Sequence, residues 1–361
     1  MTNHIQTYFF DLIKVATGYK TSLSGVPTAE EWKDIYSLTR QQTLLGVLFS
    51  AVEKLPAEQR PPRPLLLQWF GMVENIRVKN RQVNKDAVEM CDIVRKDGMR
   101  CVILKGQGVA TYYPDTSLRQ CGDIDLWIEG GIKKVVNYLR TKSNVKNPQY
   151  IHVEFEAPFK TEVEVHHRPT YFYNPISLYR ANRYFESQDE MFDHKVELPD
   201  DSGCIYAPTL EFNRFYILQH IYRHYFGEGI GLRQLFDYYY VLLKGGTEES
   251  KQRTIKLFKK TGMWKFVGAT MWVMKEVFGM EDQYLLCAPN EKAGKQLLAE
   301  VMIAGNFGKF DDRINRNNYN KLFPRMWGYI KRNMRYMKDY PQEILFEIPM
   351  RTYMYIWKHF V

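Results

Sequence analysis

The spacing of hydrophobic residues changes at Arg100 and changes back near Pro208. Before Arg100, apolar residues recur every three or four positions, which is the period of an amphipathic helix. Between Arg100 and His167, short apolar or alternating runs occur, the first two of them followed by glycine-containing turns, a pattern typical of strands. After Pro208 the helical period returns. The sequence therefore predicts a small mixed sheet between two helical regions, and the fold class is α+β.

Individual elements follow from these periods. Two helical patterns precede the sheet, the first around Trp32, Ile35 and Leu38 and the second extending to about Val94, and a proline-rich break at 61–64 separates them. The sheet is expected to use strands near 101–104, 123–128, 150–155 and 161–166, with a helix at 132–139 and the last two strands adjacent and antiparallel.

Beyond the sheet, Thr209 is expected to cap a helix that breaks at 229–231, and another helix starts at Leu232. We divide the chain into an N-terminal helical region (1–90), a mixed core (91–200) and a larger C-terminal helical domain (201–361).

Composition excludes several classes of protein. The chain has 361 residues and a net charge of +9, and 45 % of its residues are hydrophobic and 25 % charged, as in a globular protein. The longest apolar stretch, at 44–52, is far shorter than the roughly 20 residues of a membrane span. The N-terminus lacks the pattern of a signal peptide, and five scattered cysteines make neither a disulfide framework nor a zinc cluster. A cytoplasmic protein is expected.

Two acids stand at the start of the second predicted strand. Asp123 and Asp125 point to the same face of a strand, because side chains alternate with a period of two. Two such carboxylates repel each other unless a cation or a proton lies between them. Mg²⁺ takes oxygen ligands and keeps water or phosphate oxygens in its other positions. The spacing therefore predicts a Mg²⁺ site.

A third carboxylate is available on the last predicted strand. Glu162 and Glu164 lie on one face of that strand by the same alternation. We favour Glu164, because Val163 and Val165 flank it in the most apolar part of the strand.

Groups suited to phosphate precede the acids. Lys105 and Gly106 end the first predicted strand, and a glycine there lets the backbone approach a ligand closely. Arg119 lies four residues before Asp123 and offers a planar guanidinium for phosphate.

These motifs resemble those of uncharacterised bacterial nucleotidyltransferases of the DNA polymerase β-like superfamily. The residues that carry the resemblance are Lys105 and Gly106, Tyr113 and Pro114, Arg119, the Gly122-Asp-Ile-Asp-Leu126 run, and Val163-Glu-Val-His166. The resemblance covers 101–167 with motif strength and extends more weakly to His220, His224 and the stretch 231–237.

The resemblance implies an enzyme that moves a nucleoside monophosphate from an NTP to an acceptor hydroxyl. It implies that Asp123, Asp125 and Glu164 hold Mg²⁺, with Mn²⁺ as a possible substitute. It also implies that the nucleotide and its phosphates are bound by Lys105, Gly106, Arg119 and Gly122. The acceptor, whether a small molecule, a protein or RNA, is not identified by these motifs.

One departure from the superfamily pattern motivates an alternative. Lys105 and Gly106 stand where the superfamily usually has Gly-Ser, so a hydroxyl that contacts phosphate is missing. The alternative is a nucleotide-binding regulatory protein that has kept the fold without turnover.

Five further residues are candidates for the acceptor site or for support of the acids. His166 shares a face with Glu164, whereas His167 points to the other face. His220 and His224 are four apart on a predicted helix, as metal ligands or as packing residues. Arg233 and Asp237, also four apart, either pair along their helix or face the cleft.

The C-terminal tail suggests a different class of function. Residues 313–338 hold eight basic residues and no acidic one, with an apolar stripe from Met326 to Met337. This segment is either a nucleic-acid or anionic-surface contact or a terminal helix with a basic outer face. Arg214 and His220 also fit the loose Arg-x4–6-His spacing of helical RNases, which makes an RNA-binding or RNase-like module the second alternative.

Overall fold

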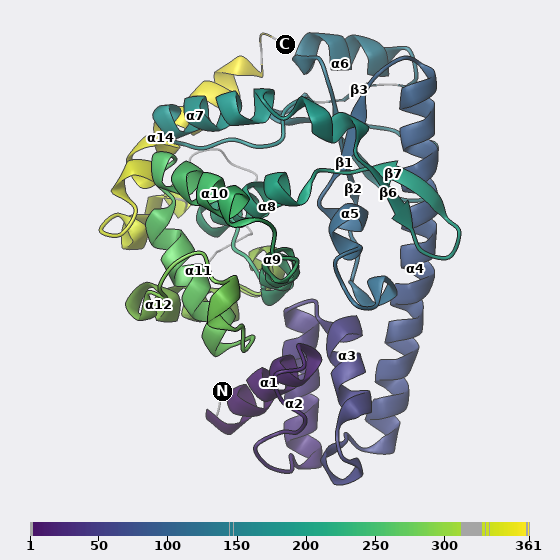
Figure 1. Cartoon of the computed structure of the whole chain (residues 1–361), viewed down its shortest axis with the longest axis vertical. Helices are drawn as coiled ribbons and strands as arrows, with labels where there is room; N and C mark the ends of the chain where they lie inside the picture. The colour runs from purple at the N-terminus through teal and green to yellow at the C-terminus, as the bar shows by residue number, and fades with distance from the viewer. Residues whose placement is uncertain are drawn as a thin grey trace.

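A computed structural model describes residues 3–143, 145–146, 148–311, 327–328, 330–331, 333–358 and 360 of the chain. Helices surround one small sheet and a separate hairpin (Figure 1). The longer helices are α1 (Asn3–Ala16), α2 (Ala29–Gln41), α3 (Leu45–Lys54), α4 (Arg63–Lys96), α6 (Gly131–Arg140), α7 (Pro175–Glu186), α8 (Leu210–Gly227), α9 (Leu232–Leu243), α10 (Glu248–Lys260), α11 (Trp264–Glu276), α12 (Glu291–Ala304) and α14 (Pro341–Trp357). The α+β class is confirmed.

The main sheet has the strand order β1-β2-β5-β4-β3. Its strands are β1 (Cys101–Leu104), β2 (Ile124–Ile128), β3 (Val145–Lys146), β4 (His152–Phe155) and β5 (Val163–His166). Strand β2 runs parallel to β5, and the other pairs are antiparallel, so the sheet is mixed. The predicted antiparallel pairing of the last two strands is confirmed.

One face of this sheet is apolar. Ile124, Leu126 and Ile128 of β2 are buried on it, in one hydrophobic cluster with side chains of β5, α4 and α6. Alternation then turns the intervening side chains of β2, Asp125 and Trp127, to the opposite face. The long helix α4 thus supports the sheet from behind, and the polar face is left for the C-terminal helices.

Helix α4 also fixes the loops that lead into the polar face. The Asn80 side-chain amide donates hydrogen bonds to the carbonyls of Ser117 (2.8 Å) and Arg119 (2.9 Å), in the loop before β2. The Asp86 carboxylate accepts from the backbone N–H (3.1 Å) and the hydroxyl (2.6 Å) of Thr161, just before β5. Both strands that carry the predicted acids therefore start at points held by one helix.

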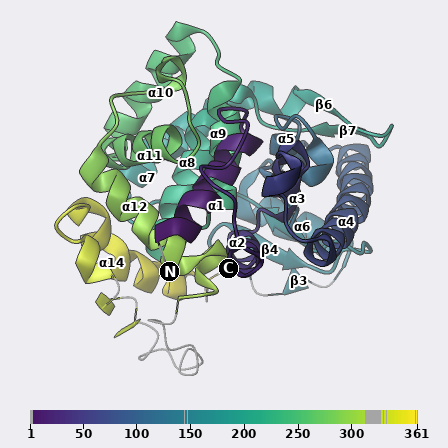
Figure 2. The ribbon, with the colours of Figure 1, turned by 90° about the horizontal axis from the view of Figure 1, so that it is seen from below.

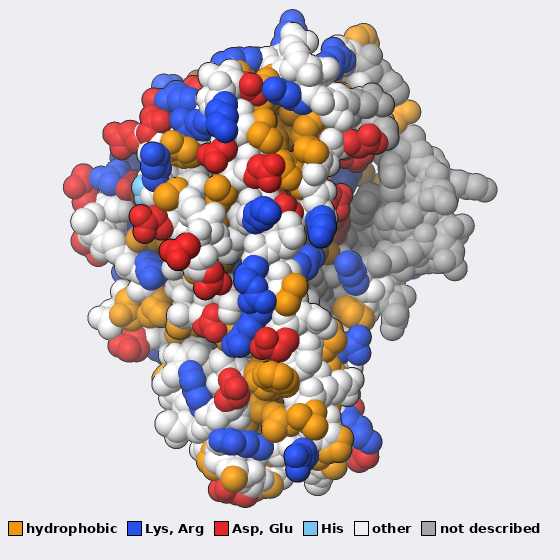
Figure 3. Space-filling view, turned by 90° about the vertical axis from the view of Figure 1, so that its right-hand side faces the viewer, with side chains coloured by type: hydrophobic (Ala, Val, Ile, Leu, Met, Phe, Trp, Pro, Cys, Tyr) orange, Lys and Arg blue, Asp and Glu red, His pale blue; other side chains and the backbone are white. Residues whose placement is uncertain are grey.

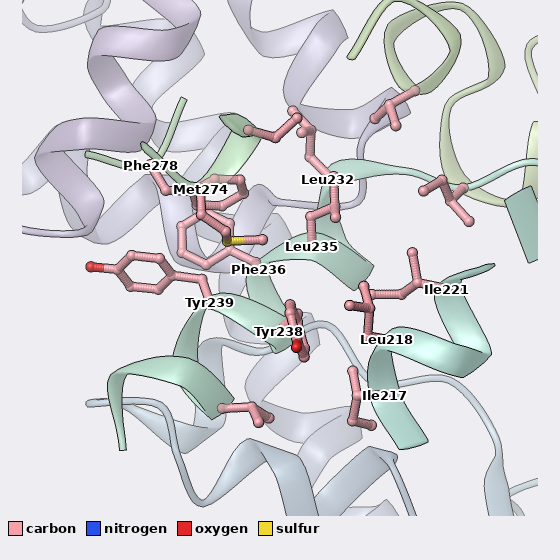
Figure 4. Close-up of a cluster of buried hydrophobic side chains, with 14 of the residues drawn as sticks. Ile217, Leu218, Ile221, Leu232, Leu235, Phe236, Tyr238, Tyr239, Met274 and Phe278 are labelled. Atoms are coloured by element: carbon pink, nitrogen blue, oxygen red, sulfur yellow. The ribbon is translucent and has the colours of Figure 1, made fainter. Parts of the chain in front are cut away.

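The C-terminal helices pack on the polar side of the sheet. Thr209 caps α8 as predicted, its hydroxyl accepting from the backbone N–H of Phe212. Side chains of α8 and α9 interdigitate in a hydrophobic cluster that includes Ile217, Ile221 and Leu235 (Figure 4). Seen from below, α4 lies on the opposite side of the molecule from α10, α12 and α14 (Figure 2). The sheet is enclosed between these two helical layers.

Three strands of the described structure were not predicted from the sequence. They are the two-residue strand β3 and the antiparallel hairpin of β6 (Lys195–Leu198) and β7 (Gly203–Tyr206). The division at 90, 200 and 361 stays a prediction, and residue 90 lies within α4.

The surface along α4 mixes positive and negative side chains with hydrophobic ones (Figure 3). Within the described ranges, no helix combines the length and apolar character that crossing a membrane requires.

Candidate active site

The three predicted acids meet on the polar face of the sheet. Strands β2 and β5 are adjacent and parallel, and their register places Asp125 directly beside Glu164. Asp123 precedes β2 by one residue and lies on the same side. One carboxylate oxygen from each of Asp123, Asp125 and Glu164 lies within 4.8 Å of the other two. The rival acid, Glu162, is exposed and lies before the start of β5.

Asp125 is the most deeply buried of the three, and two positive or proton-bearing groups contact it. The Lys105 Nζ lies 2.9 Å from Asp125 Oδ2, and the His166 Nε2 lies 2.9 Å from Oδ1. Burial acts to raise the pKa of Asp125, but the charge of Lys105 and the His166 hydrogen bond outweigh it and bring that pKa well below its usual value. Asp125 is therefore ionised at neutral pH.

The other two acids differ in their proton affinity. Desolvation by the surrounding walls, followed by the negative charge of Asp125, raises the pKa of Asp123. Desolvation also acts to raise the pKa of Glu164, but His166 and His152 lower it overall. Desolvation is the main cause of the upward shift at Asp123, and repulsion from Asp125 adds to it; a bound cation would relieve that repulsion.

Lys105 holds a backbone conformation that is rare for a residue with a side chain. Its φ is +54°, and the φ of the next residue, Gly106, is +40°. These two residues join β1 to the short helix α5 (Gly106–Ala110), and β1 pairs with β2 so that Leu104 lies opposite Asp125. The strained turn brings the Lys105 ammonium to the acids, as strained residues at functional sites often do.

The acids open into a cavity of about 280 Å³ between the sheet and the C-terminal helices. This volume is near the lower end of the range of roughly 300–1,000 Å³ typical of small-molecule sites. Polar and charged residues make up most of its lining: Lys105, Arg119, Asp123, Asp125, His152, Glu164, His166, His220, Arg223, His224, Glu228, Arg233, Gln234 and Asp237. Gly106 and Gly122 also line it.

Arg119 and Asp237 form a buried ion pair at the wall of this cavity. The Arg119 Nε and Nη2 groups donate to the two carboxylate oxygens of Asp237 at 2.7 and 2.8 Å, and the Tyr113 hydroxyl donates to the same carboxylate at 2.7 Å. Within the described part of the chain, the buried Arg119 Nη1 has no hydrogen-bond partner. Arg119 therefore ties the loop before β2 to α9, and its Nη1 amino group remains without a partner among the described residues.

Arg233 lies beside this pair and makes a different contact. Its Nη1 donates to the carbonyl of Gln120 at 3.1 Å, and burial together with the charge of Arg119 lowers its pKa. The hypothesis that Arg233 and Asp237 face the cleft agrees with this arrangement, because both line the cavity while Asp237 bonds to Arg119.

His220 and His224 face the acids from α8. The centroids of their two rings are 4.3 Å apart, and the His220 Nε2 lies 3.5 Å from the Lys105 Nζ. Burial lowers the pKa of His220 far below its usual value and that of His224 to about 4, so both imidazoles are neutral at pH 7. Among the described residues, no third side chain completes a metal-ligand group with this pair.

The environment of His224 fixes its tautomer. The ring lies between Glu228 Oε2, 3.1 Å from Nδ1, and the Arg223 Nη2, 2.6 Å from Nε2. Because Arg223 can only donate, Nε2 accepts, and Nδ1 carries the proton that it donates to Glu228.

The comparison with protein families bears on this arrangement. A family model described as uncharacterised nucleotidyltransferase matches residues 28–279, which is more than half of the chain. The chain belongs to this nucleotidyltransferase family. No curated protein is similar enough to count as a match. The matched range includes the three acids, Lys105, the Arg119–Asp237 pair and the two helical histidines.

The donor set of this family member suits a hard dication. Asp123, Asp125 and Glu164 offer only carboxylate oxygens, which are the ligands that Mg²⁺ takes, and they lie close enough for one ion to contact all three. The fit rests on donor chemistry and proximity.

Four polar residues of the cavity were not predicted from the sequence. They are His152, Arg223, Glu228 and Gln234, which line it with the predicted residues. Arg223 was within reach of prediction, because it lies three residues after His220 and so on the same side of a helix. His152 lies opposite His166 across two paired strands, and a register of that kind cannot be read from sequence spacing.

Arg214 and His220, the residue pair of the RNase hypothesis, make contacts in different parts of the structure. Arg214 donates to the Ser250 hydroxyl at 2.9 Å and to the Gly245 carbonyl, whereas His220 faces the acids. The basic tail lies mostly outside the described residues. Of its described members, Arg335 forms an ion pair with Glu300 at 3.2 Å.

Proposed function

We propose that this member of the family transfers a nucleoside monophosphate from an NTP to an acceptor hydroxyl with the help of Mg²⁺, which Mn²⁺ can replace. The observation that carries the proposal is the convergence of Asp123, Asp125 and Glu164 beside Lys105 in one cavity. When bound, the dication neutralises phosphate charge and lowers the pKa of a coordinated oxygen.

The cations of the cavity are suited to the phosphate tail. Lys105 and Gly106 line the cavity beside the acid cluster, and Arg119, whose Nη1 has no hydrogen-bond partner among the described residues, lines the same wall. Two of the three Arg119 nitrogens already bind Asp237, so we assign it a single contact to phosphate in place of the forked contact expected from the sequence. Its rigid anchoring favours the positioning that phosphoryl chemistry requires.

In the reaction, the acceptor oxygen forms a bond to the α-phosphorus, and the bond from that phosphorus to the β-phosphate oxygen breaks, releasing pyrophosphate. The acceptor hydroxyl gives up its proton to solvent as this bond forms. His220 lines the cavity 3.5 Å from Lys105, and because its pKa lies far below 7 we assign it to accept a hydrogen bond from that hydroxyl and orient it, and not to take its proton. His166 is held by Asp125 and is assigned the role of positioning that carboxylate.

A labelling experiment tests this function and finds the acceptor. The protein is incubated with each α-labelled NTP, Mg²⁺ and a cell extract, and label is sought in small molecules, protein and RNA. Asp125→Asn should reduce both transfer and pyrophosphate release by roughly 100-fold or more, the scale on which loss of a transition-state contact acts. Unchanged metal-dependent release by Asp125→Asn would refute the assignment.

One observation favours a second candidate, a nucleotide-binding regulatory protein without turnover. The Lys105 ammonium lies 2.9 Å from Asp125, where it competes with a dication for the same carboxylate, and no hydroxyl follows it. This candidate predicts nucleotide binding without pyrophosphate release in the same assay. Release that depends on Mg²⁺ would exclude it.

A further inference from the structure

Two histidines and a glutamate lie together at the edge of the acid cluster. Strands β4 and β5 pair so that His152 is directly opposite His166, and the two ring centroids are 5.5 Å apart. Glu164 lies two residues before His166 and therefore on the same face of the sheet. Three side chains of metal-binding type thus project from two hydrogen-bonded strands, which hold them at fixed spacing.

The donor atoms of these residues converge. The His152 Nδ1 lies 3.3 Å from Glu164 Oε2, and the His166 Nε2 lies 3.7 Å from the same oxygen. One donor atom from each residue lies within 4.8 Å of the other two. In the described structure, the buried His152 Nδ1 makes no hydrogen bond. The His166 Nε2 also contacts Asp125 Oδ1 at 2.9 Å, and an ion bound to this nitrogen would replace that contact. All three side chains line the cavity, so an ion can reach them.

The chemistry of this set differs from that of the carboxylate triad. Two imidazoles and one carboxylate are a common ligand set for Zn²⁺ in proteins, and imidazole also suits other borderline transition metals. An all-oxygen set suits Mg²⁺. We propose that His152, Glu164 and His166 form a transition-metal site for Zn²⁺ or a similar dication, next to the triad and sharing Glu164 with it.

The shared carboxylate makes the two sites interdependent. A dication held by the two histidines would bring its charge and one Glu164 oxygen into the wall of the cavity, within reach of ligands bound there. The site itself does not depend on nucleotidyl transfer, since it is defined by protein ligands alone. It can therefore be tested without nucleotide, and its failure would leave the proposed function untouched.

The first test is equilibrium dialysis of the full chain against Zn²⁺, followed by metal analysis. A Cys204→Ser background removes the exposed thiol, which is an unrelated ligand. One tightly bound Zn²⁺ per chain is expected. In His152→Ala, affinity should fall by more than the roughly 10- to 100-fold that loss of an outer-shell partner costs. The matched control is Glu162→Gln, an exposed carboxylate that lies before the start of β5, which should bind as before.

A second measurement needs no substitution at the site. X-ray absorption of the zinc-loaded background protein should show two imidazole ligands with oxygen completing the shell. Zinc binding that His152→Ala leaves unchanged, sulfur ligands, an all-oxygen shell, or no stoichiometric zinc would each overturn the proposal. Circular dichroism of His152→Ala checks that weaker binding does not reflect unfolding, and the absorption result stands even if that variant unfolds.

Discussion

The two faces of the five-stranded sheet are built from the same strands, but one packs in the hydrophobic core and the other lines the cavity. On one face, Leu126 and its neighbours in β2 are buried against α4 and α6 in a hydrophobic cluster. On the other, Asp125, Glu164 and His166 project toward α8 and α9, and a cavity of about 280 Å³ remains between them. Burial of apolar area stabilises the first face. The second holds like charges together and needs opposite charges and ties to the C-terminal helices to stabilise it.

The difference shows where stability and chemistry reside in this molecule. The polar face is fastened to the C-terminal helices by the Arg119–Asp237 pair, and its acids are balanced by Lys105 and His166. Substitutions on the apolar face should therefore reduce the stability of the fold, whereas substitutions among the acids should reduce activity. The exception is the buried ion pair, whose loss should affect stability most.

Breaking the Arg119–Asp237 pair should give the largest effect. Arg119→Met leaves Asp237 buried without its cation, which typically costs about 3–5 kcal/mol in the free energy of unfolding. The measurement is urea denaturation at neutral pH. Arg119→Met combined with Asp237→Leu should recover much of the loss, because no charge is then left unpaired. Strictly additive losses in the double variant would show that the pair does not act as a unit.

Truncation on the apolar face should come next. Leu126 is fully buried between β5, α4 and α6, and Leu126→Ala should lower the free energy of unfolding by about 2–5 kcal/mol through lost transfer energy and a cavity. Metal-dependent nucleotide affinity of the folded variant, measured at low temperature, should stay near that of the native protein. A large loss of affinity with unchanged stability would reverse the assignment of the two faces.

The ion pair between Lys105 and Asp125 should affect how the free energy of unfolding depends on pH. In the native protein, the pKa of Asp125 lies below its unfolded value, so its contribution is present above about pH 4 and is lost as pH falls through the folded pKa. In Lys105→Met, burial dominates and that pKa rises. Each unit of rise removes about 1.4 kcal/mol at neutral pH.

Unfolding measurements on both proteins between about pH 3 and pH 7 check this prediction. The stability difference should be largest near neutrality and should narrow on acidification. A difference that is constant with pH would mean that Lys105 acts on stability by some route other than the charge of Asp125.

The four longer strands of the main sheet, and the face to which each of their side chains points, could be predicted from the sequence, because both depend on the local alternation of apolar and polar residues. Asp123 and Asp125 were correctly placed on one side of β2, and the preference for Glu164 over Glu162 agrees with the three acids that converge in the structure. Local spacing cannot state which strand lies beside β2, so the contact between Asp125 and Glu164, 39 positions apart, came from the resemblance and from the apolar flanks of Glu164.

Long-range pairing lay beyond local patterns. Arg119 was expected to bind phosphate through two guanidinium nitrogens. In the structure, two of its three nitrogens donate hydrogen bonds to Asp237, which lies 118 positions later in the chain. Helix α8 is buried almost all round, so its hydrophobic pattern gives no single inward face from which to orient His220. Only the packed structure shows that His220 and His224 face the acids, whereas Arg214 binds Ser250 and Gly245.

The most direct test compares two carboxylates of one segment, Glu164 in the cavity and exposed Glu162. Calorimetric titration of each NTP with Mg²⁺ into native protein, Glu164→Gln and Glu162→Gln measures the contribution of the acid cluster to binding. Glu162→Gln should bind as the native protein does, and Glu164→Gln should bind about tenfold more weakly or worse, a difference of about 1.4 kcal/mol. Equal affinity in Glu164→Gln and native protein would contradict the account.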